Sequence, residues 1–178
     1  MVDYFEFYGL PVTFHPDAAE IKRKFYELSK KYHPDFYINE SEEKQAEVLE
    51  LTTINNKAYQ VLSNPQKRVH YILELKGQLV EGENYSLPQS FLMEMMDVNE
   101  ALMDLQFDPD AERLATLKTE VDEIEKGLSD QIAALTTSFE LKDKEAQLRI
   151  LNAIKDLYYR NKYLYRIRES IKKAESAA

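Results

Sequence analysis

Apolar residues recur at three- and four-residue steps over most of this 178-residue chain. That spacing places them along one face of an α-helix, whereas the alternating pattern of a half-buried β-strand is nearly absent. Hydrophobic residues make up 44% of the chain and charged residues 31%, and there are only four glycines. Because such a composition can bury real cores, we predict an all-α protein that folds.

The first 75 residues contain the start and stop signals of four helices. A short helix around residues 4–9 is predicted to end at Gly9, which accepts a left-handed turn, and Pro11 prevents its continuation. The other three are predicted at residues 17–32, 41–62 and 65–75, with Asp17, Ser41 and Asn64 as their N-caps. These residues are predicted to form the first domain, 1–75.

A break in the helical pattern separates this domain from the rest of the chain. Residues 76–87 contain Gly77 and Gly82 and are predicted to form a connector. Three longer helical patterns follow at about 88–106, 109–138 and 142–174, with Asp108 and Pro109 expected to be the N-cap and first residue of the second. We predict that residues 88–178 form an antiparallel three-helix bundle.

Charge and cysteine content exclude several classes of function. The chain has no cysteine, so it offers no disulfide, thiolate metal site or cysteine nucleophile, and any metal would be held by another protein. The net charge is -9, and residues 97–146 alone hold fourteen Asp and Glu against five Lys and Arg. Such a surface argues against nucleic-acid binding, which needs a sustained cationic face. We predict no metal and no cofactor.

The chain shows no signal for membrane insertion or export. No apolar stretch approaches the roughly 20 residues that a membrane-spanning helix needs. The N-terminal sequence MVDYFEFYGL lacks the apolar core of a signal peptide. We therefore expect a cytoplasmic protein that does not interact with membranes.

The predicted helix at residues 17–32 has two distinct faces. Its apolar face is predicted to pack on the core and consists of Ile21, Phe25, Leu28 and Tyr32. The opposite face is basic, because residues 20–31 hold five basic and two acidic residues; its candidate binding residues are Lys22, Arg23, Tyr26 and Lys30. Taken alone, such a charge run is best interpreted as a solvated face.

His33-Pro34-Asp35 follows this helix directly. Proline disfavours helical geometry in the residue before it, so the helix must stop near Tyr32 or His33 and present the tripeptide in a restricted conformation. His33 and Asp35 could be imagined as part of a catalytic or metal site. No serine, cysteine or third carboxylate stands nearby to complete a mechanism, so we predict no enzymatic activity.

The predicted helix at residues 88–106 carries two apolar groups. One group has the spacing of a core face and consists of Phe91, Met95, Val98 and Leu102. The second lies on another arc and consists of Leu92, Met93, Met96 and Met103, together with Asp97, Glu100 and Asp104. From the residues alone, this second group is either buried by wide packing or exposed as a binding surface.

The first domain resembles the J-domain family over residues 1–75. The resemblance rests on the order DYFEFYGLP, KKYHPDF, a charged loop and INNKAYQVLSNPQKRVHYIL. It implies that His33, Pro34 and Asp35 engage a DnaK-type chaperone and stimulate its ATP hydrolysis. It also implies that the basic helix face, with Lys22, Arg23, Tyr26 and Lys30, docks on an acidic surface of that chaperone.

Nearly the whole chain resembles the HscB-type co-chaperones of iron–sulfur cluster assembly. A J-domain is followed by a short connector and a helical domain containing SFLMEMMDVNEAL, without a Gly/Phe-rich region or cysteine repeats. The resemblance implies two partners, an HscA-type chaperone and an IscU-type cluster scaffold protein. The implied scaffold-binding residues are Leu92, Met93, Met96, Asp97, Glu100 and Asp104.

Two features qualify this resemblance. Many relatives complete the scaffold-binding patch with an aromatic residue from the last helix, whereas this chain has Asn152-Ala153-Ile154 in that region. The cysteine-rich N-terminal extension of some relatives is lacking, so the bacterial type is expected. The alternatives are a general J-domain co-chaperone for unfolded clients and a helical adaptor that does not act on an ATPase.

Overall fold

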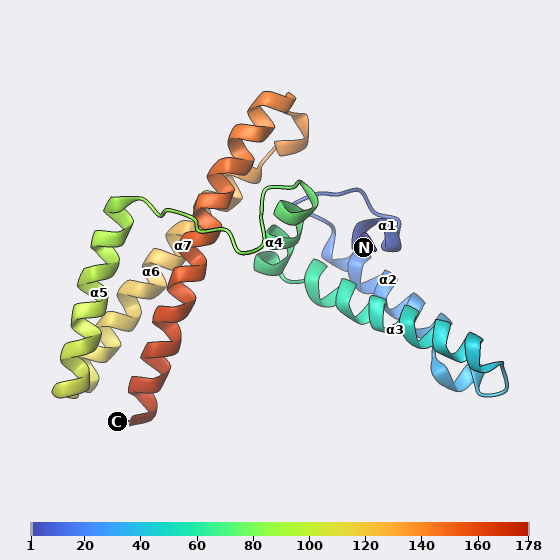
Figure 1. Ribbon diagram of the computed structural model, residues 1–178, viewed down its shortest axis with the longest axis horizontal. Coiled ribbons are helices and arrows are strands. Elements are labelled where there is room, and N and C mark those ends of the chain that lie inside the picture. The colour runs from blue at the N-terminus through green and yellow to red at the C-terminus, as the bar shows by residue number, and fades with distance from the viewer. Residues whose placement is uncertain (1, 178) are drawn as a thin grey trace. The chain divides into compact units, whose positions relative to one another are not determined.

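The computed structural model describes residues 2–177, and the regular structure in that range is helical, without a β-strand. This confirms the predicted all-α class. The chain divides into two compact units, Met1–Gly77 and Gln78–Ala178, which Figure 1 shows in blue to green and in green to red. None of the helices in the described range is long and apolar enough to cross a membrane.

The first unit is a helical hairpin with two short helices packed on it. Its elements are α1 (Tyr4–Tyr8), α2 (Ala18–Lys31), the 3-10 helix η1 (Pro34–Tyr37), α3 (Glu42–Leu62) and α4 (Pro65–Leu75). Helices α2 and α3 run antiparallel and η1 lies in the turn between them (Figure 1). Helices α1 and α4 both contact α3. The turn carrying His33-Pro34-Asp35 therefore lies at one end of the hairpin.

Helices α2, α3 and α4 begin at the predicted caps. The side chain of Asp17 accepts a hydrogen bond from the backbone N–H of Ala19. The side chain of Ser41 accepts one from the backbone N–H of Lys44. The side chain of Asn64 accepts one from the backbone N–H of Lys67. Gly9 ends α1 with a φ of 66°, a value that L-residues with a side chain rarely adopt. These local interactions explain why sequence signals located the helix ends within one or two residues.

A buried amide joins three helices of the first unit. Asn55 on α3 is 1% exposed, and its side-chain oxygen accepts a hydrogen bond of 2.9 Å from the hydroxyl of Tyr8 on α1. Its amide nitrogen donates to the carbonyl of Phe25 and the hydroxyl of Ser29 on α2, at 3.1 and 3.0 Å. Burial raises the pKa of the Tyr8 hydroxyl, which therefore remains a donor. Asn55 thus has a structural role.

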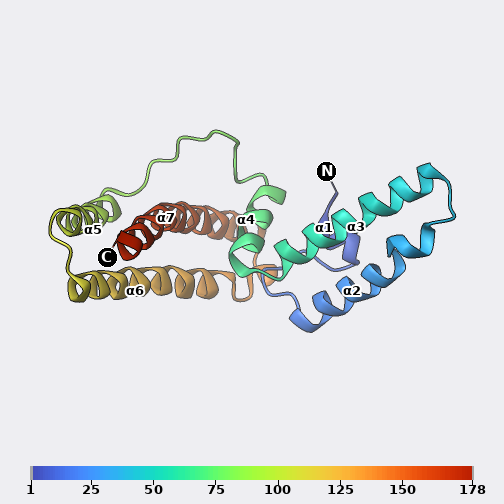
Figure 2. The same ribbon diagram turned by 90° about the horizontal axis from the view of Figure 1, so that it is seen from below.

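The second unit is a three-helix bundle. Its elements are α5 (Gln89–Phe107), α6 (Ala111–Thr136), the 3-10 helix η2 (Phe139–Leu141) and α7 (Lys144–Ala177). Figure 2 shows α5, α6 and α7 side by side, and all three contact one another. The core between them includes Met95 and Leu102 from α5, Val121 from α6, and Leu164 from α7. This arrangement is the one predicted from three amphipathic helices joined by short turns.

The start of α6 differs from the prediction. Asp110, and not Asp108, is the N-cap, and its carboxylate accepts hydrogen bonds from the N–H groups of Glu112 and Arg113. Asp108 is instead the C-cap of α5, with its N–H bonded to the carbonyl of Asp104 at 2.8 Å. Pro109 therefore lies between the two helices, because α5 continues one residue further than its apolar pattern indicated and Asp108 caps its end.

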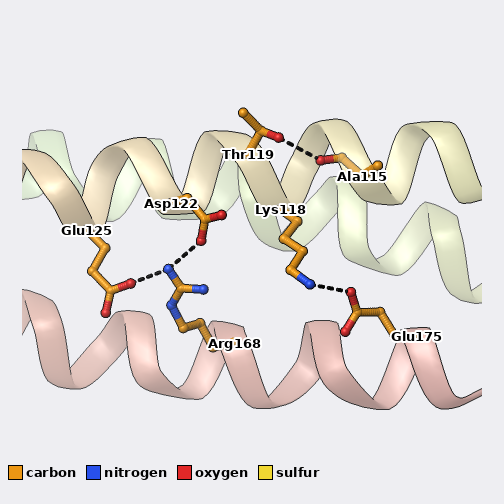
Figure 3. A network of polar contacts seen from close by, with 7 residues as sticks. All are labelled: Ala115, Lys118, Thr119, Asp122, Glu125, Arg168 and Glu175. Atoms are coloured by element: carbon orange, nitrogen blue, oxygen red, sulfur yellow. Dashed lines mark hydrogen bonds and ion pairs between the residues drawn. The ribbon is translucent and has the colours of Figure 1, made fainter.

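Ion pairs between α6 and α7 neutralise part of the acidic segment. Arg168 on α7 binds Asp122 at 2.6 Å and also contacts Glu125 (Figure 3). One turn of α6 closer to its start, Lys118 pairs with Glu175 of α7 at 2.7 Å. The negative charge of residues 97–146 is thus unevenly presented, since Asp122 and Glu125 of α6 share the cationic partner Arg168. The Lys118 pair does not add to this neutralisation, because Glu175 lies outside the acidic segment.

The second half of the predicted connector is attached to α7. The carboxylate of Glu83 accepts hydrogen bonds from Lys155 at 2.6 Å and from the hydroxyl of Tyr159 at 3.0 Å. The ring of Tyr85 stacks on that of Tyr159, with centroids 4.4 Å apart, and its hydroxyl donates to Asp156 at 2.9 Å. This part of the connector packs as a piece of the second unit.

Candidate binding surfaces

The His-Pro-Asp turn has the local geometry that its proline requires. Helix α2 ends at Lys31 with Tyr32 as its C-cap, and His33 is extended, with φ -67° and ψ 124°, before Pro34 opens η1. The Nδ1 atom of His33 accepts a hydrogen bond of 3.3 Å from the N–H of Asp35, which in a neutral imidazole leaves the proton on Nε2. The Asp35 carboxylate lies 3.8 Å from the same Nδ1, too far for a hydrogen bond. Both side chains are exposed.

Contacts on both sides hold this turn in place. The hydroxyl of Tyr37 donates to the carbonyl of Lys31 at 2.8 Å, at the end of α2. From α3, Thr52 donates to the carbonyl of Tyr32 at 2.9 Å, and the amide of Gln45 donates to the carbonyl of Ile38 at 3.1 Å. The turn is therefore preorganised while its three named side chains, His33, Pro34 and Asp35, stay accessible.

The basic face of α2 is exposed as predicted. Lys22, Arg23, Tyr26 and Lys30 all lie on the surface. Arg23 is 3.6 Å from Glu20 and 3.5 Å from Glu27 on the same helix, and such exposed pairs contribute little and exchange partners readily. The opposite side of the helix is fixed, because Ile21 is buried and Phe25 stacks on Tyr59 of α3 at 4.3 Å. The cations are thus directed away from α3.

Helix α5 exposes its second apolar group. Leu92 is 39% exposed, Met93 60%, Met96 68% and Met103 59%. Phe91, Met95, Val98, Leu102 and Leu105 are buried. Of the two interpretations that the residues left open, burial is therefore wrong, and this face of α5 is an uncovered apolar surface of the kind that marks interaction sites.

Charge and apolarity occupy separate strips along this face. At 100° per residue, Leu92, Met96 and Met103 form one strip, here termed the apolar strip. Asp97, Glu100 and Asp104 form a second, the acidic strip, and Met93 lies among them. The three carboxylates are exposed, so the surface pairs a hydrophobic edge with an anionic one.

Contacts with the neighbouring helices define the edges of these strips. On the α7 side, the amide of Asn99 donates to the hydroxyl of Tyr163 at 3.1 Å. On the α6 side, the guanidinium of Arg113 lies 3.9 Å from the carboxylate of Asp104. The apolar strip therefore faces the α7 side and the acidic strip the α6 side. Arg113 was not foreseen, because no local signal ties it to Asp104.

The last helix adds no aromatic ring at residues 152–154, the region where the HscB resemblance led us to look for one. Ile154 is fully buried in the bundle, whereas Asn152 is exposed and Ala153 is half-buried. No group of three or more His, Asp or Glu side chains placed to hold a metal ion occurs within residues 2–177. The candidate residues thus form two surfaces, the turn with α2 and the face of α5, each within one unit.

Comparison with known proteins agrees with both units. The model of the DnaJ domain matches residues 3–71, and that of the HSCB C-terminal oligomerisation domain matches residues 87–172. The co-chaperone protein HscB homolog of Vibrio parahaemolyticus is 31% identical over 165 residues, which cover 87% of this chain and 94% of that protein. The chain belongs to the HscB co-chaperone family.

Other HscB proteins support the same assignment. The co-chaperone HscB of Proteus mirabilis is 33% identical over 114 residues, which cover 64% of this chain and 66% of that protein. The solved structure of the chaperone HscB from Vibrio cholerae matches with a TM-score of 0.72 and 25% identity, over 99% of each chain. The predicted HscB resemblance is confirmed. HscB proteins are co-chaperones and not an enzyme class, and a J-domain implies a chaperone partner of the DnaK class.

Proposed function

We propose that this HscB-family protein stimulates the ATPase of an HscA-type chaperone and delivers an iron–sulfur cluster scaffold protein to it. The observation that carries the proposal is the combination of two exposed surfaces in one chain. The first unit presents a preorganised His-Pro-Asp turn at the end of a cationic helix, and the second presents an apolar and acidic helix face.

The first surface fits a role in docking to the chaperone. Lys22, Arg23 and Lys30 would accelerate the encounter with an acidic surface and fix its orientation. The Asp35 carboxylate is exposed and is positioned by the turn to accept a charge-assisted contact from a chaperone arginine. Because the turn is already ordered, little conformational entropy would be lost when the complex forms.

The second surface fits a role in holding the scaffold. Leu92, Met93 and Met96 would bury apolar area against it, and methionine adapts to an irregular partner surface. Asp97, Glu100 and Asp104 would select a partner with cations beside its apolar ridge. The protein then performs no covalent chemistry: it joins two partners, and ATP hydrolysis by the chaperone tightens the chaperone's grip on the scaffold.

Single-turnover ATP hydrolysis by the chaperone tests the first half of this proposal. We expect wild type to accelerate hydrolysis and His33→Gln to leave it near the unstimulated rate, because the turn would lose a group that faces the partner. His15→Gln is the matched control, since His15 is exposed on the same unit but outside the turn. Equal stimulation by wild type and His33→Gln would contradict the proposal.

A pull-down from lysate tests the second half. A variant with Leu92, Met93 and Met96 changed to Ala is expected to lose the scaffold protein and to retain the chaperone. Binding of a denatured model protein is the counterpart measurement. Tight binding of that protein by wild type, without binding of any cluster scaffold, would favour a general J-domain co-chaperone and contradict the delivery of a scaffold.

A further inference from the structure

The apolar strip of α5 does not end at Met103. Phe107, the last residue of α5, is 85% exposed and follows Met103 by one helical turn. The steps from Leu92 to Met96, Met103 and Phe107 are four, seven and four residues, so all four side chains lie on one side of the helix. At about 1.5 Å per residue, the extended strip is roughly 22 Å long.

The bundle does not account for these two side chains. Leu102 and Leu105, on the inward side of the same turn, are buried in the core. Met103 and Phe107 point away from that core and remain largely exposed. A large apolar side chain gains free energy when it leaves water, so an uncovered phenylalanine next to an uncovered methionine indicates a surface that another molecule covers.

The extended strip has different neighbours on its two sides. The hydrogen bond from Asn99 to Tyr163 marks the α7 side. On the other side lie Glu100 and Asp104, which are one helical turn apart. The anionic edge ends where Arg113 approaches Asp104. A partner that covers the strip would therefore meet anions along one edge only, and chiefly beside Met96 and Met103.

We infer that the scaffold-binding surface extends to Met103 and Phe107 at the C-terminal end of α5. The inference rests on the proposed function and commits to the same occupant, the cluster scaffold protein. Its contact surface would be an apolar ridge with cations along one edge, which face Asp97 and Glu100. Phe107 supplies a large ring of low conformational entropy, and Met103 adapts to the ridge beside it.

Calorimetric titration of the purified scaffold protein into the full-length chain tests the inference. Phe107→Ala is expected to weaken binding roughly tenfold, as truncation of a large aromatic contact does, and Met103→Ala to weaken it less. Phe107→Leu should recover most of the affinity. Leu141→Ala is the matched control, because Leu141 is 86% exposed on the same unit, in η2 and away from α5; its Kd should stay within about twofold of wild type.

The possible failures can be told apart. If the scaffold binds wild type and Phe107→Ala with equal Kd, the extension is overturned while the proposed function stands. If wild type does not bind the scaffold, the proposed function itself fails. A lowered melting temperature of Phe107→Ala would assign the residue a structural role and overturn the inference. Unchanged chaperone ATPase stimulation by this variant in the absence of scaffold is the supporting result.

Discussion

The guanidinium of Arg113 on α6 lies 3.9 Å from the carboxylate of Asp104 on α5 and 3.8 Å from that of Asp108. This arrangement places a cation at the end of the acidic strip. Asp104 is therefore partly neutralised within the protein, whereas Asp97 and Glu100 present their charge to a partner without such a neighbour among the ion pairs of the described residues.

Arg113→Gln is therefore expected to strengthen binding of a cationic scaffold surface. The substitution removes a positive charge that would repel the cations of the partner, and it leaves the negative charge of Asp104 without an internal counter-ion. At such exposed sites the gain in binding free energy is about 0.5 kcal/mol. Titration at low and high salt measures it, and the gain should shrink at high salt. By the same logic Asp97→Asn should weaken binding more than Asp104→Asn. Weaker binding by Arg113→Gln would contradict this arrangement.

The basic face of α2 should control the rate of association with the chaperone. A variant with Lys22 and Lys30 changed to Ala is expected to associate roughly tenfold more slowly at low salt, because electrostatic steering is reduced. The difference from wild type should fade as salt increases. Stopped-flow association kinetics measure both effects. A variant with Lys57 and Lys67 changed to Ala, on α3 and α4, serves as the control; equal slowing by both variants would rule out a specific surface.

Asn55 should contribute strongly to the stability of the first unit. Asn55→Ala removes three side-chain hydrogen bonds, those with the Tyr8 hydroxyl, the Phe25 carbonyl and the Ser29 hydroxyl, at an expected cost of about 1–3 kcal/mol. The Tyr8 hydroxyl keeps the backbone carbonyl at position 55 as an acceptor, at 3.1 Å. Asn56→Ala, at the exposed neighbouring position, should change stability by less than about 0.5 kcal/mol. The protection of backbone amides in α2 and α3 against hydrogen exchange measures the loss of stability in both variants. Equal protection in the two variants would refute the role given to Asn55.

The attachment of the connector to α7 should depend on pH through Glu83. Hydrogen bonds from Lys155 and, more weakly, from Tyr159 hold the pKa of Glu83 below its ordinary value. A carboxyl with a lowered folded-state pKa stabilises the fold above its unfolded-state pKa, and this contribution is lost as pH falls through the folded-state pKa. Glu83→Gln should thus be less stable than wild type at pH 7, and the difference should shrink in acid.

Urea unfolding of the two proteins between neutral and acid pH measures this difference. Glu81→Gln is the control, because Glu81 is an exposed glutamate of the same segment. A Glu83→Gln difference that stays constant down to strongly acid pH would refute the coupling.

At the alkaline end, burial and hydrogen bonding raise the pKa values of Tyr85 and Tyr159 to about 12. Wild type should therefore lose stability as pH rises from the ordinary tyrosine value toward about 12.

Sequence signals predicted the helices well but gave no indication of the contacts that residues 76–87 make with α7. Helix ends depend on residues within four positions of one another, such as Ser41 and Lys44, so they can be found without knowledge of the fold. Glu83 and Lys155 are separated by 72 residues, and the polar, glycine-containing composition of residues 76–87 gives no sign of their contact. The misplaced start of α6 has a similar origin, because aspartate stands at both 108 and 110, and only the path of the chain between α5 and α6 made Asp110 the cap in place of the predicted Asp108.

The amino-acid sequence alone determined the helical class and the His33-Pro34-Asp35 turn, because apolar periodicity, capping side chains and proline stereochemistry act locally. It also specified two apolar groups on α5 and assigned one of them to the core, but it left open whether the second was buried or exposed. The packing of α5 against α6 and α7 decided that Met95 is buried and Met96 is not, and it brought Arg113 to Asp104. Exposure is a property of what surrounds a side chain, so it required the positions of residues far away in the sequence.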